Sequence, residues 1–254
     1  MRERVCLRCG DALHSGSSAS TFCRRCRSAS PLFTRAVAYG PYQGRMREAI
    51  HALKYGGLRP LARKLGGFLA QAIAQLEAEA PREMLVVPVP LHRSKHALRG
   101  FNQARVLAAA ALDVLHRSHP DWHLRLAPET LLRQRATQSQ AGLTPHQRRL
   151  NLRGAFAVSD AARVADAHVL LVDDILTTGA TARAAARVLM EAGAASVRVA
   201  TLARAYRVSD TNDDAQQEAT LRPPAEKDQE LFAATVPRIS SSMHVDSSHD
   251  HHLF

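Results

Sequence analysis

The sequence has few aromatic residues and no cysteine beyond its first segment. Phe, Trp and Tyr make up 5% of the 254 residues, and all four cysteines lie within the first 26 positions. A body without cysteine cannot depend on disulfide bonds, which is typical of proteins from reducing compartments. The scarcity of aromatic side chains also leaves little surface on which single-stranded bases could stack.

Long apolar runs are absent as well. No run reaches the roughly 18 residues that a membrane-spanning helix needs, and the opening MRERVCLRCG lacks the apolar stretch of a signal peptide. We therefore expect a cytoplasmic protein without a membrane span. Hydrophobic residues still account for 46% of the chain, and its length suffices for one α/β domain with additional segments.

Negative charge is scarce in most of the chain. Residues 1–207 hold 31 Lys and Arg against 14 Asp and Glu, a net charge of +17, whereas the segment from Val208 onward holds three against nine, a net charge of −6. A basic body favours an anionic partner, either a phosphate-rich small molecule or nucleic acid. Charge alone does not choose between the two.

The four cysteines form two CxxC pairs, Cys6 with Cys9 and Cys23 with Cys26, separated by thirteen residues. This spacing is typical of a zinc ribbon, in which each pair supplies two thiolates. We favour Zn²⁺ over disulfide bonds or four independent thiols. Because four thiolates fill a tetrahedron, such an ion would be structural rather than catalytic. Residues 1–30 are expected to form this zinc-ribbon module.

Strands and helices are expected to alternate through residues 31–206. Apolar alternation and apolar runs predict strands at 36–40, 84–90, 155–158, 168–174 and 196–204, and helical periodicity predicts helices at 45–53, 58–76, 103–118 and 182–192. This order predicts an α/β domain, a parallel sheet flanked by helices.

The remaining segments are polar. Residues 92–102 are expected to form a basic loop. Much of 125–159 is expected to form a long loop rich in Gln, Arg and Thr, which at this length is usually functional. Lys54 is interpreted as a solvated cation at the end of its helix, favoured by the helix dipole. The tail 207–254 has no periodicity and is expected to be disordered.

The stretch VLLVDDILTTGAT spans residues 169–181 and carries the strongest functional pattern. A buried strand followed by an acidic turn would explain its apolar start, but not two adjacent negative charges at the strand's exit. Ligands of parallel sheets bind at the carboxyl ends of the strands. Thr177, Thr178, Gly179, Ala180 and Thr181 open the next helix, where free N–H groups and the helix dipole favour a phosphate. With Asp173 and Asp174 beside them as acceptors, the pattern suits ribose 5-phosphate.

This stretch resembles the 5-phosphoribosyl 1-pyrophosphate (PRPP) binding signature of type I phosphoribosyltransferases. Over about residues 5–205 the chain is also similar to the ComF/GntX family. The members of this family are PRPP-transferase-like proteins, and some of them are linked to competence and DNA uptake. The likeness rests on the cysteine pairs, LKYGG, VPVPLHRSKHALRGFNQA, RQRATQSQAGL, RRLNLRGAF and TLAR. The resemblance implies a type I phosphoribosyltransferase-like fold with an N-terminal four-cysteine zinc ribbon.

The resemblance also implies roles for individual residues. Asp173 and Asp174 would contact the ribose hydroxyls of PRPP, directly or through Mg²⁺, and residues 177–181 would hold its 5-phosphate. The pyrophosphate would meet the loop 91–99, which we favour over a solvated basic patch, and a mobile lid formed by 133–153. The residues implied are His92, Arg93, Lys95 and Arg99 in the loop, and Arg133, Arg135, Gln140, Arg148 and Arg149 in the lid. His92 is a candidate general base.

Two functions therefore compete. The first is Mg²⁺-dependent transfer of ribose 5-phosphate from PRPP to an acceptor, with release of pyrophosphate. The second is a non-catalytic zinc-ribbon accessory protein that binds PRPP, nucleic acid or DNA-uptake proteins, favoured by Arg8, Arg24, Arg25 and Arg27 around the cysteines. The sequence leaves the acceptor and the oligomeric state open.

Overall fold

The computed structural model describes residues 4–13, 20–56, 60–135, 147, 152 and 154–206. All of them belong to one unit, Met1–Ser209. The predicted disordered tail, and most of the predicted lid, with Gln140, Arg148 and Arg149, lie outside the described residues. None of the described helices is long and apolar enough to cross a membrane.

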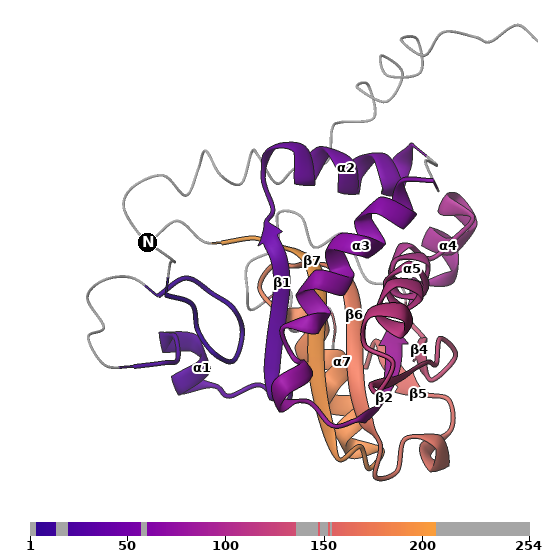
Figure 1. Cartoon of the computed structure of the whole chain (residues 1–254). Coiled ribbons are helices and arrows are strands. Elements are labelled where there is room, and N and C mark those ends of the chain that lie inside the picture. The colour runs from indigo at the N-terminus through magenta and orange to yellow at the C-terminus, as the bar shows by residue number, and fades with distance from the viewer. Residues whose placement is uncertain are drawn as a thin grey trace, which may run out of the picture. The chain divides into compact units, whose positions relative to one another are not determined.

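A five-stranded sheet organises the fold, and each pair of neighbouring strands in it is parallel (Figure 1). In spatial order its strands are β1 (Arg35–Pro41), β7 (Ser196–Arg204), β6 (His168–Leu176), β2 (Glu83–Pro88) and β3 (His123–Leu126). The prediction of an α/β fold with a parallel sheet is confirmed. A separate antiparallel pair, β4 (Leu131–Arg133) and β5 (Phe156–Val158), brackets the segment predicted as the lid.

Helices cover both faces of the sheet. They are α1 (Arg24–Ser28), α2 (Gly44–Tyr55), α3 (Leu61–Ala74), α4 (Arg93–Arg99), α5 (Gln103–Ser118) and α7 (Ala180–Glu191), with short 3₁₀ turns at Glu77–Glu79 and Ala161–Arg163. The prediction of a basic loop at 92–102 was wrong, because this segment contains α4. The His92 ring accepts a hydrogen bond from the Ser94 N–H at its start, and Gly100, with φ +71°, ends it in the left-handed conformation.

The central strand β6 explains why both faces need cover. Leu170 and Val172 belong to the hydrophobic cluster formed with α2, α3 and α5. Val169 and Leu171 belong to a second cluster, formed with α7 and with three of the cysteines. Successive side chains of a strand point to opposite faces. The apolar run of β6 therefore contributes to both cores, and the carboxyl end of β6 lies between them.

The contact between α3 and α5 requires a glycine. A Cβ added to Gly66 would overlap the side chain of Ala110 and lie 2.9 Å from the Ala110 carbonyl carbon. Its neighbour Gly67, in the same helix, has nothing within 4 Å of the equivalent position. One glycine therefore allows the helices to approach, and the other serves no packing role in the described structure.

We expect Gly66→Ala to destabilise the protein by about 1–3 kcal/mol, because the added methyl group must displace the backbone of α5. Gly67→Ala, the matched control, should stabilise it by about 0.5–1 kcal/mol through helix propensity. Urea unfolding of the two variants measures both effects. Shifts of the same sign in both variants would contradict this account of the contact.

Candidate functional site

The acidic pair lies inside β6 rather than after it. β6 continues to Leu176, and Asp173 is in register with Thr201 of β7. The strand predicted at 168–174 therefore extends two residues further than predicted, because β7 runs alongside and supplies backbone partners as far as Arg204. The consequence is geometric, since neighbouring residues of a strand point to opposite faces. The two carboxylates thus enter different surroundings.

Asp174 faces α2 and forms an ion pair with Lys54. Asp174 is 5% exposed, and the side chain of Lys54 is 16% exposed. The interpretation of Lys54 as a solvated cation was wrong. The last turn of α2 lies against the carboxyl edge of the sheet, where the lysine finds a buried carboxylate instead of water.

Asp173 lies on the other side, half-buried, and lines a small hollow. Thr177, Gly179, Ala180 and Thr181 line the same hollow, as does Thr201 from the neighbouring strand. One oxygen of Asp173 accepts a hydrogen bond from the Asp174 N–H at 2.9 Å. The structure thus brings the first acid of the pair together with the threonine- and glycine-containing turn.

The two acids differ in proton affinity. Burial, and the neighbouring charge of Asp174, raise the pKa of Asp173 well above its ordinary value. Burial would also raise the pKa of Asp174, but Lys54 and a hydrogen bond with Asp173 outweigh it, so that this pKa lies below the ordinary value. The same ion pair raises the pKa of Lys54 despite its burial. Asp174 and Lys54 are therefore both charged at neutral pH.

The turn Thr177–Thr181 has the backbone of an anion site. Gly179 adopts a left-handed conformation, with φ +73°, at the N-terminus of α7, and its carbonyl accepts from the Arg183 N–H at 2.9 Å. The Thr178 hydroxyl accepts from the Ala180 N–H at 3.3 Å. A residue with a Cβ would be strained at this φ. The first N–H groups of a helix lack acceptors within it, which makes the start of α7 suitable for a phosphate.

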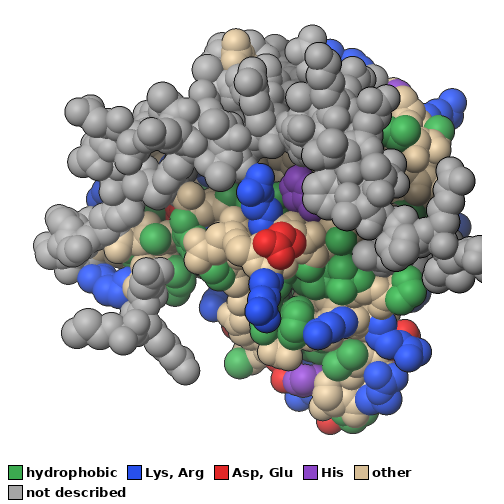
Figure 2. Space-filling view, turned by 90° about the horizontal axis from the view of Figure 1, so that it is seen from above, with side chains coloured by type: hydrophobic (Ala, Val, Ile, Leu, Met, Phe, Trp, Pro, Cys, Tyr) green, Lys and Arg blue, Asp and Glu red, His purple; other side chains and the backbone are tan. Residues whose placement is uncertain are grey.

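Three of the predicted cations surround the acids. Burial, followed by repulsion from Arg133 and Arg99, lowers the pKa of Lys95. Burial also lowers the pKa of Arg133, against an attraction from Asp173. Arg99 contributes to the low pKa of Asp174. Seen from above the carboxyl edge, acidic side chains lie in the middle of the described surface with Lys, Arg and His side chains around them (Figure 2).

The other predicted cations lie differently. The His92 ring is occupied in capping α4 through Ser94. Arg93, at the start of that helix, and Arg135, after β4, are exposed. The structure thus brings Lys95, Arg99 and Arg133 towards the acidic pair, and leaves Arg93 and Arg135 at the surface.

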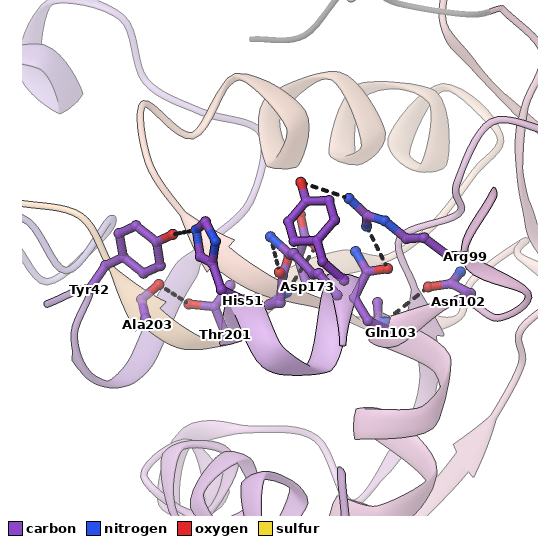
Figure 3. A network of polar contacts seen from close by, with 12 residues as sticks. Tyr42, His51, Arg99, Asn102, Gln103, Asp173, Thr201 and Ala203 are labelled. Carbon is purple, nitrogen blue, oxygen red and sulfur yellow. Dashed lines mark hydrogen bonds and ion pairs between the residues drawn. The ribbon is translucent and has the colours of Figure 1, made fainter. Parts of the chain in front are cut away.

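Sequence reasoning missed a polar row on α2. Tyr42 and His51 share a hydrogen bond of 3.0 Å between the hydroxyl and Nε2. Tyr55 accepts a hydrogen bond from Arg99 at 3.3 Å, and the guanidinium lies 5.0 Å from its ring centroid (Figure 3). The signal was present, because His51, Lys54 and Tyr55 are spaced i, i+3 and i+4 and so share one helix face.

The four cysteines meet at the other recognisable site. Their four sulfur atoms all lie within 4.8 Å of one another, and the sulfurs of Cys9 and Cys23 are 3.6 Å apart. This separation excludes a disulfide, whose sulfurs are about 2.05 Å apart, and matches the roughly 3.8 Å expected for a tetrahedral zinc site with bonds of about 2.3 Å. A hydrogen bond with Cys26, together with burial, raises the pKa of the Cys9 thiol. The cluster fits a structural Zn²⁺, which would hold the cysteines as thiolates.

We expect Lys54→Met to destabilise the protein by about 3–5 kcal/mol at neutral pH, because Asp174 would remain buried without a compensating charge. The exposed Lys64 of α3 provides a matched control, Lys64→Met, which should have little effect. Thermal or urea unfolding measures the difference.

The pH dependence gives a second criterion for this pair. Because the pKa of Asp174 is lowered in the folded protein, the stabilisation is present above the ordinary carboxylate pKa and is lost as the pH falls through the lowered value. The gap between the wild type and Lys54→Met should therefore narrow in acid. A gap that is constant with pH would show that the lysine acts through packing alone.

Comparison with known proteins agrees with this geometry. Residues 102–231 match the family model described as phosphoribosyl transferase domain. The chain is 33% identical over 208 residues to the DNA utilization protein YhgH of Salmonella typhi, covering 80% of this chain and 86% of the relative. It is 29% identical over 201 residues to Competence protein F of Haemophilus influenzae, covering 76% and 83%. It is 28% identical over 164 residues to Competence protein ComFC of Bacillus subtilis, covering 64% and 61%. The chain therefore belongs to the phosphoribosyl transferase domain family, as a ComF-family phosphoribosyltransferase-like protein.

Proposed function

We propose that this protein binds PRPP with Mg²⁺ at the carboxyl edge of the sheet and transfers its 5-phosphoribosyl group to an acceptor, releasing pyrophosphate. The observation that carries the proposal is that Asp173 and four of the five residues of the turn Thr177–Thr181 line one hollow. A phosphate at the N-terminus of α7 and hydroxyls at the acid are the two ends of a phosphorylated pentose.

Each part of the ligand has a chemical counterpart in this proposal. Residues 177–181 receive the 5-phosphate through backbone N–H groups and hydroxyls. Asp173 and Asp174 accept hydrogen bonds from the ribose hydroxyls, with Asp174 shared with Lys54. Lys95, Arg99 and Arg133 face the pyrophosphate, for which guanidinium groups offer paired donors and the ammonium group a point charge.

The reaction is a displacement at the anomeric carbon. The bond from this carbon to the pyrophosphate oxygen breaks, the electron pair leaves with pyrophosphate, and a bond to the acceptor forms. Bound Mg²⁺ would neutralise charge on the leaving group. The cations of α4 and β4 stabilise the same charge, and the carboxylates favour the positive charge that develops on the sugar.

When the acceptor attacks the sugar, it must lose a proton to a basic side chain. The ring of His92, the candidate from the sequence, is engaged in capping α4. His51 is better suited, because burial and the nearby Lys54 lower its pKa, which keeps the ring neutral at pH 7. It lies on α2, the element that carries the partner of Asp174. In this proposal His51 takes the proton of the acceptor.

We expect Asp173→Asn to weaken binding of PRPP in the presence of Mg²⁺ at least about tenfold, because an amide group replaces one carboxyl acceptor of the ribose hydroxyls. The variant leaves the ion pair of Lys54 intact, so the fold should be retained. The double variant Asp113→Asn with Asp121→Asn removes charge only from exposed positions and should bind as the wild type does. Calorimetry measures both affinities. Undisturbed binding by Asp173→Asn would rule out this site, and pyrophosphate release on addition of a metabolite extract would test turnover.

A second candidate function is nucleic-acid binding by the zinc-ribbon module predicted at residues 1–30, called the cysteine module below. It is favoured by the exposed arginines Arg4, Arg24 and Arg27 on this module, and two of the relatives carry competence in their names. Exposed arginines of this kind contact phosphate backbones without reading sequence.

We expect the triple variant Arg4→Ala, Arg24→Ala and Arg27→Ala to lose any shift of single-stranded DNA that the wild type gives at low salt. The control removes the same charge from exposed residues of α3 and α5, through Arg63→Ala, Lys64→Ala and Arg117→Ala. Each lost contact should lower the slope of log affinity against log salt by about 0.7. A wild type that retains no DNA at low salt, or a control that loses binding equally, contradicts this role for the module.

A further inference from the structure

The cysteine module touches the anion-binding turn directly. Arg25 lies in α1 between Cys23 and Cys26, and its Nη1 donates a hydrogen bond of 3.0 Å to the carbonyl oxygen of Thr178, a residue 153 positions away. Thr178 is the centre of the turn that the proposed function assigns to the 5-phosphate. The module is therefore more than an appendage of the sheet.

Arg204 provides a second connection to the same turn. Its Nη1 donates to the carbonyl oxygens of Leu176, at 3.0 Å, and of Thr177. Its Nη2 lies 3.3 Å from a carboxylate oxygen of Asp11. The Asp11 carbonyl in turn accepts from the Cys6 N–H at 2.7 Å. A buried arginine at the end of β7 thus joins the first cysteine pair to the start of the turn.

Packing and a third arginine reinforce the contact. Arg183, in the first turn of α7, donates to the Ala29 carbonyl at 2.8 Å, just after α1. Cys6, Cys9 and Cys26 belong to the same buried cluster as Leu176, Ala180 and Ala182. These contacts therefore reach Leu176 just before the turn, Thr178 within it and Arg183 after it.

Peptide geometry gives these contacts a consequence. In a planar trans peptide the carbonyl of one residue and the N–H of the next point in opposite directions. Arginine donors on the carbonyls of Leu176, Thr177 and Thr178 therefore fix the N–H groups of Thr177, Thr178 and Gly179 on the side away from the arginines. Aligned N–H groups of this kind bind anions without further reorganisation.

We propose that Arg25 and Arg204 are positioning residues for the anion-binding turn, and that the metal state of the four-cysteine site sets the affinity for the 5-phosphate through Arg25. The inference rests on the proposed function. α1 has five residues, which is too short to persist as an isolated helix. It is held by two cysteines of the cluster, Cys23 at its N-cap and Cys26 within it. Loss of the metal therefore releases Arg25 from Thr178 and leaves the turn without its orienting donor.

The first test compares Arg25→Ala with Arg24→Ala, which removes an exposed neighbour from the same helix. The probes are ribose 5-phosphate with Mg²⁺ and, separately, inorganic pyrophosphate, both measured by calorimetry on the full chain. Arg25→Ala should weaken ribose 5-phosphate about tenfold, as expected for one charged hydrogen bond, and leave pyrophosphate unchanged. Arg24→Ala should change neither. Amide hydrogen exchange at Thr178 and Gly179 should accelerate in Arg25→Ala alone.

A second test removes the metal from the wild type and from Arg25→Ala with a chelator. If the metal acts through Arg25, chelation weakens ribose 5-phosphate about tenfold in the wild type and adds little in the variant, since coupled changes are not additive. Equal losses in both proteins overturn the inference. Arg25→Lys keeps a single donor, so its affinity for ribose 5-phosphate should lie between those of the wild type and Arg25→Ala. If Arg25→Ala does not fold, Arg25→Lys takes its place in both tests.

The outcomes separate the two proposals. A wild type that binds ribose 5-phosphate no more tightly than Arg25→Ala does, with equal exchange at the turn, overturns the positioning role and leaves the proposed function standing. A wild type that binds neither ribose 5-phosphate nor PRPP overturns the proposed function. In that case hydrogen exchange still decides whether the module orders the turn.

Discussion

The buried ion pair between Lys54 and Asp174 fixes the upper part of the candidate site. α2 fully buries two apolar residues, Ile50 and Leu53, and packs Met46 and Ala49 partly against the same core, so hydrophobic contact attaches it along one narrow face. Taking two charges out of water costs several kcal/mol for each ion, and the pair persists only because each charge compensates the other. The pair therefore specifies where the end of α2 meets β6, and with it the position of the polar row formed by His51 and Tyr55.

The pleat of β6 then divides two adjacent carboxylates between two environments. Asp174 is charged beside Lys54, whereas burial and the neighbouring charge of Asp174 raise the pKa of Asp173. Neighbouring titratable groups whose surroundings separate their pKa values are typical of sites that handle protons and polar ligands. Two acids in a surface turn would both be solvated, and their pKa values would be similar. Their place within a strand is thus what gives the Asp-Asp pair its chemistry.

The local patterns were predictable, and the contacts between distant segments were not. The strand, turn and helix around residues 169–191 and the cysteine cluster follow from apolar periodicity, glycine and spacing, which are properties of short stretches. The short helix α4 was missed because its limits depend on a histidine cap and one left-handed glycine. Lys54 was misinterpreted because its partner is remote in the chain, and no local pattern reveals which helix end will be covered.

The charges around the site have an order that suits a ligand with two anionic ends. At one end, arginines of the cysteine module and of β7 occupy the carbonyls of the turn, so its N–H groups face outward. In the middle lie carboxylates, which accept hydrogen bonds from neutral hydroxyls. At the other end, Lys95 and Arg133 are close enough for burial and mutual repulsion to lower the pKa of Lys95. An anion bound there would relieve this repulsion and raise that pKa again. Donors, acceptors and cations therefore follow one another in the order in which the proposed function would place phosphate, ribose and diphosphate.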